Sequence, residues 1–308
     1  MRSFILFLNL FICFSVLGQH TTWKEKLGYD DEDILLIIHG DDLGVTHAVN
    51  IASIDGLENG IMNSVSIMVP CPWFEEIADY FVKNPQHDYG LHLTLTAEWK
   101  HFKWDGLFDQ HSSPGLHNEK GYLYEDVASV VQNASLEEVE NEIRAQIDKA
   151  LLSGLKPTHL DSHMGTLFAK KEFLQALVNL GEEYKMPVFL PVPENHPWAN
   201  EILTKNSVIV NNLSMNDSHL KKTEIFEYYD NVIKNLKPGL NEIIVHLGKD
   251  NEELRATCID HPYFGSEWRQ FDWDYIKSKH VQQLLKKNDI KLITWREIQQ
   301  AIYGQKSR

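Results

Sequence analysis

The sequence predicts an α/β fold in which seven or eight parallel strands form a (β/α) barrel within a single domain. Short apolar runs alternate with helical patterns from residue 34 almost to the C-terminus, as in proteins built on a parallel sheet. Polar residues suited to chemistry follow at least four of these runs, as at the rim of a barrel, whereas an open sheet gathers its site at one crevice. The chain also lacks the Gly-x-Gly-x-x-Gly and phosphate-loop motifs.

Strands are expected where the apolar runs are short, and helices where apolar residues recur every three to four positions. The expected strands are 34–38, 63–68, 89–93, 157–161, 187–191, 242–246 and 290–294, with a further candidate at 207–211. The expected helices are 47–59, 73–84, 136–153, 170–184, 222–235, 273–287 and 296–303. The helix 136–153 has the clearest ends, because Ser135 and Glu138 form a capping box and Gly154 closes it before Pro157.

The segment from about 98 to 133 breaks this alternation and is rich in glycine, histidine and aromatic residues. A loop of this length inside a compact domain is usually functional or disordered. Because it follows the strand that contains His92, we expect it beside the site, where it could form a wall for a substrate.

The composition fits one domain without nucleic-acid partners. The chain has 308 residues, 43% of them hydrophobic, and no linker or repeat divides it. Its formal net charge of −15 argues against binding to nucleic acid, since few cations are available to neutralise phosphates. The two cysteines beyond the N-terminal segment, Cys71 and Cys258, could pair in an exported protein or simply be small buried hydrophobes.

The first residues have the layout of a secretory signal peptide over 1–18. One positive charge precedes an apolar stretch too short to span a bilayer, and Val16-Leu17-Gly18 offers a cleavage site. The alternative is an uncleaved membrane anchor. We expect export to the periplasm or the extracellular space, with residues 19–308 forming the domain and no membrane span after cleavage.

Asp41 and Asp42 lie where the buried strand 34–38 runs out. Because adjacent residues on a strand face opposite ways, the two carboxylates are expected to do different jobs. One can bind a metal ion while the other accepts a proton. The alternative is a helix N-cap with a first-turn acid, since Gly44 leads into the next helix.

Histidines form the rest of the candidate site. In an extended segment His159, Asp161 and His163 would share one face, a density of metal-capable side chains that points to a metal site with carboxylate support. His92 is either a ligand or a hydrogen-bonded core residue. His246 ends another apolar run and could hand a proton to a leaving amine, or it could be a core histidine.

At these residues the chain resembles the YdjC-like carbohydrate deacetylases, which include chitooligosaccharide deacetylases and hopanoid-biosynthesis deacetylases. The matching motifs follow the family's order along the chain. They are His39-Gly40-Asp41-Asp42-Leu43-Gly44 with Asn50, Asn59-Gly60-Ile61-Met62-Asn63-Ser64, Gly90-Leu91-His92-Leu93-Thr94-Leu95-Thr96, and Pro157-Thr158-His159-Leu160-Asp161-Ser162-His163. The resemblance implies a TIM-like barrel with a modified strand count.

The resemblance also implies roles for particular residues. Asp42, His92 and His163 would bind one divalent metal cation, Mg²⁺ or Zn²⁺. Asp41 would be the general base, and His246 the general acid. The chain departs from many relatives after His163, where it lacks further histidines, and this argues against a chitooligosaccharide as the substrate.

The sequence thus predicts an exported metal-dependent hydrolase that removes an N-acetyl group from a sugar or glycoconjugate through a metal-activated water. Aromatic side chains of the long segment and near Trp268 could stack on sugar faces. One alternative is an O-acetyl sugar esterase with the same site, and another is a non-catalytic carbohydrate-binding protein on the barrel. The sequence leaves the oligomeric state open.

Overall fold

The computed structural model describes residues 22–191, 197–216, 220–261, 264–288 and 290–304. The expected signal peptide, 1–18, lies outside the described residues. Among the helices that are described, none has the length and apolar character needed to cross a membrane.

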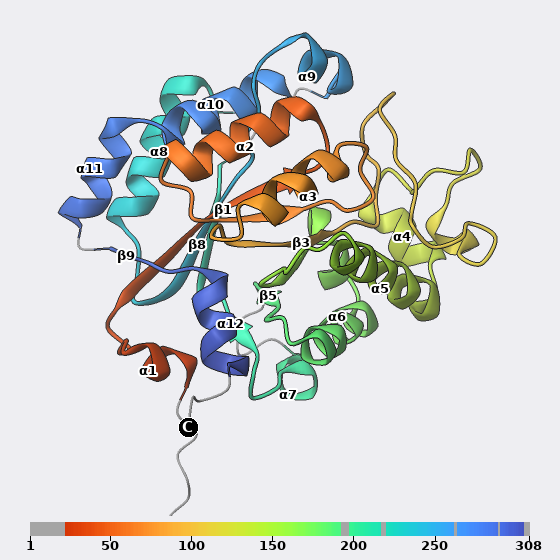
Figure 1. The fold of residues 1–308 in the computed structure, drawn as a ribbon, viewed down its shortest axis with the longest axis horizontal. Helices are drawn as coiled ribbons and strands as arrows, with labels where there is room; N and C mark the ends of the chain where they lie inside the picture. Colours follow the sequence, from red (N-terminus) through yellow and green to blue (C-terminus); the bar gives the residue numbers. More distant parts are fainter. Residues whose placement is uncertain (1–21, 192–196, 217–219, 262–263, 289, 305–308) are drawn as a thin grey trace, which may run out of the picture.

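A parallel sheet forms the centre of the fold (Figure 1). Its strands are hydrogen-bonded in the order β4-β3-β2-β1-β8-β7, and β9 also pairs with β1. These strands are β1 (Ile34–Leu43), β2 (Ser64–Ile67), β3 (Tyr89–Leu93), β4 (Leu160–Ser162), β7 (Asn212–Met215), β8 (Gly239–Val245) and β9 (Lys291–Leu292). The first strand is central because it is the long apolar run, and Leu35 to Ile38 are at most 1% exposed.

The sheet curves as an open barrel rather than a closed one. β5 (Phe189–Leu190) and β6 (Val208–Ile209) form a separate two-stranded sheet between β4 and β7. A single parallel bridge, Leu160 to Val188, joins β4 to the chain entering β5. Strands of two or three residues form too few ladder hydrogen bonds to continue the sheet, so the expected closed barrel is not present as a continuous ladder among the described residues. The prediction of a parallel α/β sheet is confirmed.

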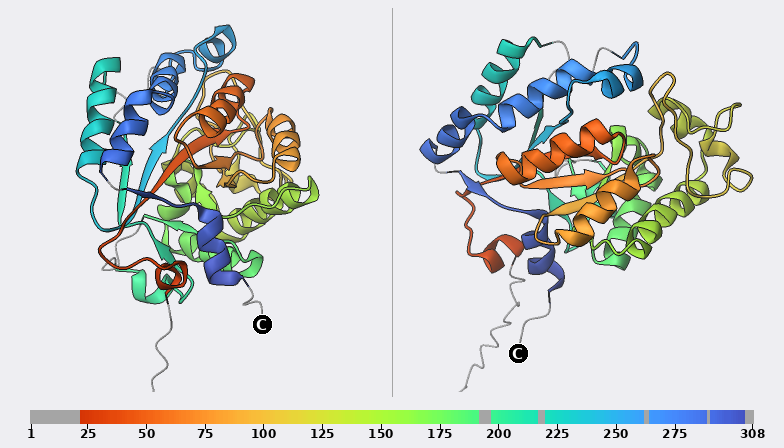
Figure 2. Two further views of the ribbon diagram at one scale, coloured as in Figure 1. Left: turned by 60° about the vertical axis from the view of Figure 1, so that its left-hand side comes forward. Right: turned by 45° about the horizontal axis from the view of Figure 1, so that its top comes forward.

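Helices surround the strands in each view (Figure 2). They are α1 (Trp23–Leu27), α2 (His47–Asn59), α3 (Phe74–Lys83), α4 (Val127–Asn133), α5 (Leu136–Leu152), α6 (Lys171–Tyr184), α7 (Ala199–Ile202), α8 (Lys222–Lys234), α9 (Glu252–Thr257), α10 (Ser266–Ile276), α11 (Lys279–Lys287) and α12 (Trp295–Tyr303). The expected helix 273–287 is wrong, because α10 ends at Ile276 and Ser278 caps a new helix by accepting from the Val281 N–H.

The long segment after β3 projects beyond the sheet, together with α4, at the right of Figure 1. It contains a 3₁₀ turn, η1 (Pro114–Leu116). The fully buried carboxylate of Glu142, on α5, accepts hydrogen bonds from the backbone N–H groups of Leu107 and Phe108. This anchor holds the loop against the domain although the loop has little regular structure of its own.

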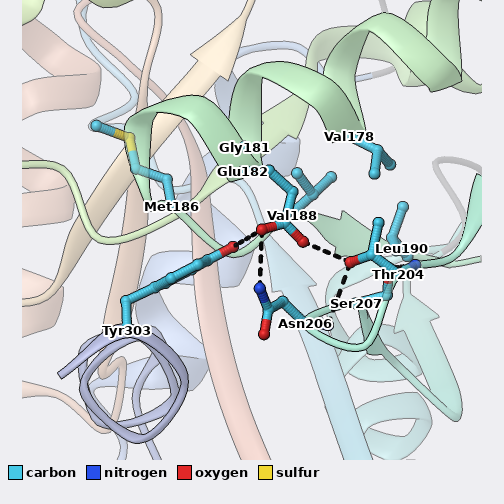
Figure 3. Close-up of a pocket in the computed structure, with 10 residues that line it drawn as sticks. All are labelled: Val178, Gly181, Glu182, Met186, Val188, Leu190, Thr204, Asn206, Ser207 and Tyr303. Atoms are coloured by element: carbon cyan, nitrogen blue, oxygen red, sulfur yellow. Dashed lines mark hydrogen bonds between the residues drawn. The ribbon is translucent and has the colours of Figure 1, made fainter. Parts of the chain in front are cut away.

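A small hollow lies where the C-terminal helix, α12, meets α6 (Figure 3). Glu182 accepts hydrogen bonds there from Tyr303 at 3.3 Å, Asn206 at 2.8 Å and Thr204 at 2.5 Å. The hollow measures about 10 Å³, which is the size of one water molecule. It is therefore a packing feature that fixes α12, not a substrate site. The two cysteines, Cys71 and Cys258, are both buried and unpaired.

Candidate active site

The three predicted metal ligands meet above the sheet. Asp42 Oδ1 lies 3.5 Å from His92 Nε2 and 3.4 Å from His163 Nδ1, and all three side chains are buried. This Oδ1 has no hydrogen-bond partner, although burial normally requires one. Donors about 2.1 Å from one tetrahedral cation stand about 3.4 Å apart, so the two distances from Asp42 Oδ1 fit a shared divalent metal.

An unusual backbone conformation brings both aspartates into the site. Asp42 has a φ of 70°, and the register between β1 and β2 shifts between Gly40 and Leu43. The expected alternation of faces is therefore wrong here. Asp41 Oδ2 and Asp42 Oδ1 both approach His92 Nε2, at 3.8 and 3.5 Å, and both line one cavity.

Each candidate ligand has a second partner that fixes its direction. His92 Nδ1 is 2.6 Å from Asp161 Oδ1, and His163 Nε2 is 3.0 Å from Glu98 Oε2. Arg269, on α10, donates to Asp42 Oδ2 at 2.7 Å. These contacts leave His92 Nε2, His163 Nδ1 and Asp42 Oδ1 facing the same point, as carboxylate support of liganding histidines requires.

Two of these supporting residues were not singled out as such by the sequence. Arg269 follows Trp268 in α10, and an arginine among aromatic residues was the available signal. No local signal pointed to the role of Glu98, because this residue follows β3 in an irregular segment whose path the local pattern does not determine.

Asp41 and His246 lie side by side at the cavity. Asp41 Oδ1 is 3.2 Å from His39 Nε2 and accepts from Ser66 Oγ at 3.3 Å, while its Oδ2 lies 3.9 Å from His246 Nε2. His246 follows directly after β8, and its backbone N–H donates to Asp272 Oδ2 at 2.9 Å. The two residues expected to move protons are therefore adjacent.

The charges of the site favour a cation at its centre. Burial alone would lower the pKa of His163, but the Glu98 and Asp42 carboxylates outweigh it and raise that pKa to about 10. Burial would likewise raise the pKa of Asp42, yet Arg269 and His163 hold it well below its usual range. The same carboxylates would attract a metal ion, which takes the place of ligand protons when it binds.

His246 differs from the other site histidines in its protonation. Burial lowers the pKa of its imidazole to about 4, against the opposing attraction of Asp42 and Asp41. Its ring packs against Phe264 and Trp268, with ring centroids 5.1 and 5.5 Å away. The His246 ring is therefore neutral near pH 7.

A second polar layer lies beneath the site. His39 Nε2 is 3.2 Å from both Asp41 Oδ1 and Asp161 Oδ2, so it links the candidate base to the carboxylate that supports His92. His159 lies deeper and stacks on Trp295 with ring centroids 5.1 Å apart. Gly90 makes room for it, since a Cβ there would lie 2.5 Å from the His159 ring.

The three residues of the predicted cluster, His159, Asp161 and His163, thus occupy three different positions. His163 is not on the strand but begins the 3₁₀ turn η2 (His163–Phe168), where it faces Asp42. Asp161, on β4, contacts the imidazoles of His92 and His39. His159 packs in the core instead, where its Nδ1 lies 3.0 Å from the hydroxyl of Thr158.

The candidate ligands open into a cavity of about 500 Å³. Trp99, from the long segment, lines it, which agrees with the expected position of that segment beside the site. Trp104 and Trp268 are only 3% and 4% exposed and pack behind His163 and His246. These two tryptophans are therefore not available to stack on a sugar, contrary to expectation, because they fill the space behind the site.

The chain is similar to known proteins over most of its length. The family model described as YdjC-like protein matches residues 35–287. A carbohydrate deacetylase of Thermus thermophilus is 29% identical over 287 residues, covering 91% of this chain and 98% of the relative. A carbohydrate deacetylase of Thermoanaerobacter pseudethanolicus is 26% identical over 269 residues, covering 84% and 97%.

A solved structure shares the fold. It is the crystal structure of a candidate cellobiose-phosphate cleavage protein of Enterococcus faecalis V583, with a TM-score of 0.73 and 23% identity. The match covers 86% of this chain and 99% of that chain. Because the family model covers most of the chain, including both aspartates and every candidate ligand, the resemblance seen in the motifs is confirmed, and the chain belongs to the YdjC-like protein family.

Proposed function

We propose that this protein is an exported, metal-dependent carbohydrate deacetylase that hydrolyses an N-acetyl group on a sugar or glycoconjugate. One observation carries the proposal: the unpartnered Asp42 Oδ1 faces His92 and His163, with Asp41 and His246 beside it in the same cavity. The relatives named carbohydrate deacetylase match over nearly their whole length, which supports this reaction class.

In this proposal Asp42, His92 and His163 hold one divalent cation. When bound, the cation would lower the pKa of a water and polarise the acyl oxygen. Asp41 accepts the proton of the attacking water. Its Oδ1 is held by His39 and Ser66, so Oδ2 remains directed to the cavity and to His246.

His246 then protonates the leaving nitrogen, since an amine is a poor leaving group without a proton. The imidazole is neutral at the start, because burial holds its pKa at about 4. The proton must therefore reach it during the reaction. Asp41 Oδ2, 3.9 Å from His246 Nε2, is the nearest carboxylate to supply the proton it has taken from water.

The donor set leaves Zn²⁺ and Mg²⁺ as the candidate metals. Two imidazoles and one carboxylate suit zinc better, since magnesium prefers oxygen ligands. The family resemblance keeps magnesium as the alternative. Metal content measured after purification without chelator, and again after reloading with each ion, separates the two.

The same residues could hydrolyse an O-acetyl ester, for which the leaving oxygen needs less help from His246. A binding protein without catalysis is the second alternative. The adjacency of Asp41 and His246 favours an enzyme, because a binding protein needs no paired base and acid.

The test is acetate release from a panel of N-acetylated and O-acetylated sugars, using protein stripped with a chelator and resupplied with Zn²⁺ or Mg²⁺. We expect metal-dependent release from an N-acetyl sugar that is lost in Asp41→Asn and His163→Ala. Asp31→Asn and His111→Ala are matched controls, since these side chains are 98% and 93% exposed. A protein that binds no metal at all would refute the proposal.

Export is tested separately, by producing the full chain with its N-terminal segment and determining the N-terminus of the mature protein. Cleavage after Gly18 supports the signal peptide. An intact Met1 in a membrane fraction would favour an uncleaved anchor.

A further inference from the structure

Part of the active-site cavity is lined by apolar side chains. We call it the apolar wall, and it consists of the side chains of Phe168, Leu213, Met215 and Ile244, completed by the buried ring of Phe189. They come from η2, β5, β7 and β8, the region where the barrel ladder is interrupted. The wall therefore belongs to the same cavity as the reacting groups.

The register of the sheet explains why this wall faces inward. Met215 pairs with Ile244, and Leu213 pairs with Glu242, whose carboxylate contacts His39 inside the barrel. Neighbouring residues of paired strands point to the same face, so Leu213 and Met215 point into the interior as well. Both remain 43% and 41% exposed, because the cavity lies in front of them.

Large apolar side chains left open to water inside a cavity indicate a ligand that covers them. Of the other exposed apolar residues, Leu152 is 88% exposed at the end of α5 and lines none of the described hollows. The apolar wall differs because its exposed members, Leu213 and Met215, alternate on one strand and share a cavity with the candidate ligands.

Several polar side chains lining the cavity bond to the protein itself, whereas the buried Arg269 Nη1, His246 Nδ1 and Asp42 Oδ1 have no partner. Ser162 Oγ accepts from the Leu167 N–H, Glu98 holds His163, and Arg269 donates to Asp42 and to the Phe264 carbonyl. A hydroxyl-rich sugar ring pressed against the apolar wall would lose water without gaining partners from it. An apolar group would gain from the same contact.

We propose that the substrate is an N-acetylamino sugar with an apolar aglycone, and that this aglycone packs on the apolar wall while the acetamide faces the candidate metal ligands. The proposal rests on the proposed deacetylase function for the orientation of the acetamide. It assigns the wall a role in substrate choice rather than in the chemistry.

The test compares the methyl and butyl β-glycosides of N-acetylglucosamine with N,N′-diacetylchitobiose, both by acetate release and by calorimetric binding. Burying one methylene fully strengthens binding about fourfold, and the apolar wall would cover only one side of the butyl group. For the three added methylenes we therefore expect about a tenfold advantage of butyl over methyl, in kcat/KM and in Kd.

The variants Leu213→Ser and Met215→Ser should reduce this butyl-to-methyl ratio towards one. Leu152→Ser is the matched control and should keep the wild-type ratio. Thermal melting checks that each variant is folded. Equal values for methyl and butyl in the wild type, or stronger binding of the chitobiose, would overturn the proposal.

Binding separates the two proposals. If no glycoside releases acetate but butyl still binds about ten times more tightly than methyl, the deacetylase function fails and the apolar wall stands. If acetate is released from every sugar at the same rate and affinity, the function stands and the role of the wall is refuted.

Discussion

Asp161 is the most informative position to change, because its carboxylate contacts two imidazoles without being a proposed ligand. Asp161 Oδ1 is 2.6 Å from His92 Nδ1, and Oδ2 is 3.2 Å from His39 Nε2. Loss of such a supporting partner typically weakens metal binding 10- to 100-fold. Asp161→Asn keeps an acceptor for His92 but loses the charge, so we expect about tenfold weaker Zn²⁺ binding. Asp161→Ala removes both, and we expect about 100-fold.

The assay is titration of Zn²⁺ into metal-free protein by calorimetry at one pH. A tenfold loss corresponds to about 1.4 kcal/mol and a 100-fold loss to about 2.7 kcal/mol, so the two variants are easily resolved. Asp31→Asn, at a 98% exposed side chain, should bind as the wild type does. If Asp161→Ala bound zinc with unchanged affinity while remaining folded, the argument that Asp161 orients His92 would be wrong.

Three further predictions concern the base, a glycine and a buried histidine. Asp41→Asn should lower kcat at least about 100-fold while changing the Kd for metal little, as measured by acetate release and calorimetry. Gly90→Ala should lower the free energy of unfolding in urea by about 1–3 kcal/mol, because the new Cβ would lie 2.5 Å from the His159 ring; an unchanged midpoint would show that the ring can move. Burial lowers the pKa of His159 well below that of an unfolded histidine, so below about pH 6.5 the unfolded chain takes up a proton that the folded chain resists, and stability falls as pH falls. From pH 6.5 to 5.5 this contributes about 1 kcal/mol, and urea titrations of His159→Gln should show a correspondingly weaker pH dependence than the wild type; identical curves would contradict the assignment.

Elements with strong local signals were predictable from the sequence. The uninterrupted apolar run became the central strand β1, and the Ser135–Glu138 capping box starts α5 as expected. The short strands were harder, because β5 and β6 have two residues each and are defined by their partners rather than by their own pattern. The candidate strand 207–211 proved to be part of a longer segment that pairs first with β5 and then, as β7, with β8.

The candidate site also contains residues whose positions the sequence predicts and residues whose positions it does not. Asp42, His92 and His163 lie together because strand ends of a parallel sheet meet at one edge, which the element order already indicates. The direction of Asp42 was not predictable by alternation, since it depends on one backbone angle. Glu98 and its hydrogen bond to His163 depend on the path of an irregular loop, and only the folded chain shows it.

The left-handed backbone conformation at Asp42 lowers stability, whereas the aspartate side chain is required by the proposed metal site. An aspartate with a φ of 70° adopts a conformation that glycine takes up freely, at a cost of about 1 kcal/mol. A library at this position selected only for folding should therefore enrich asparagine, which tolerates this conformation and still offers an acceptor to the buried Arg269, while one selected for turnover should restore aspartate. A sequence chosen by design software for stability alone would erase the residue on which the proposed metal site depends.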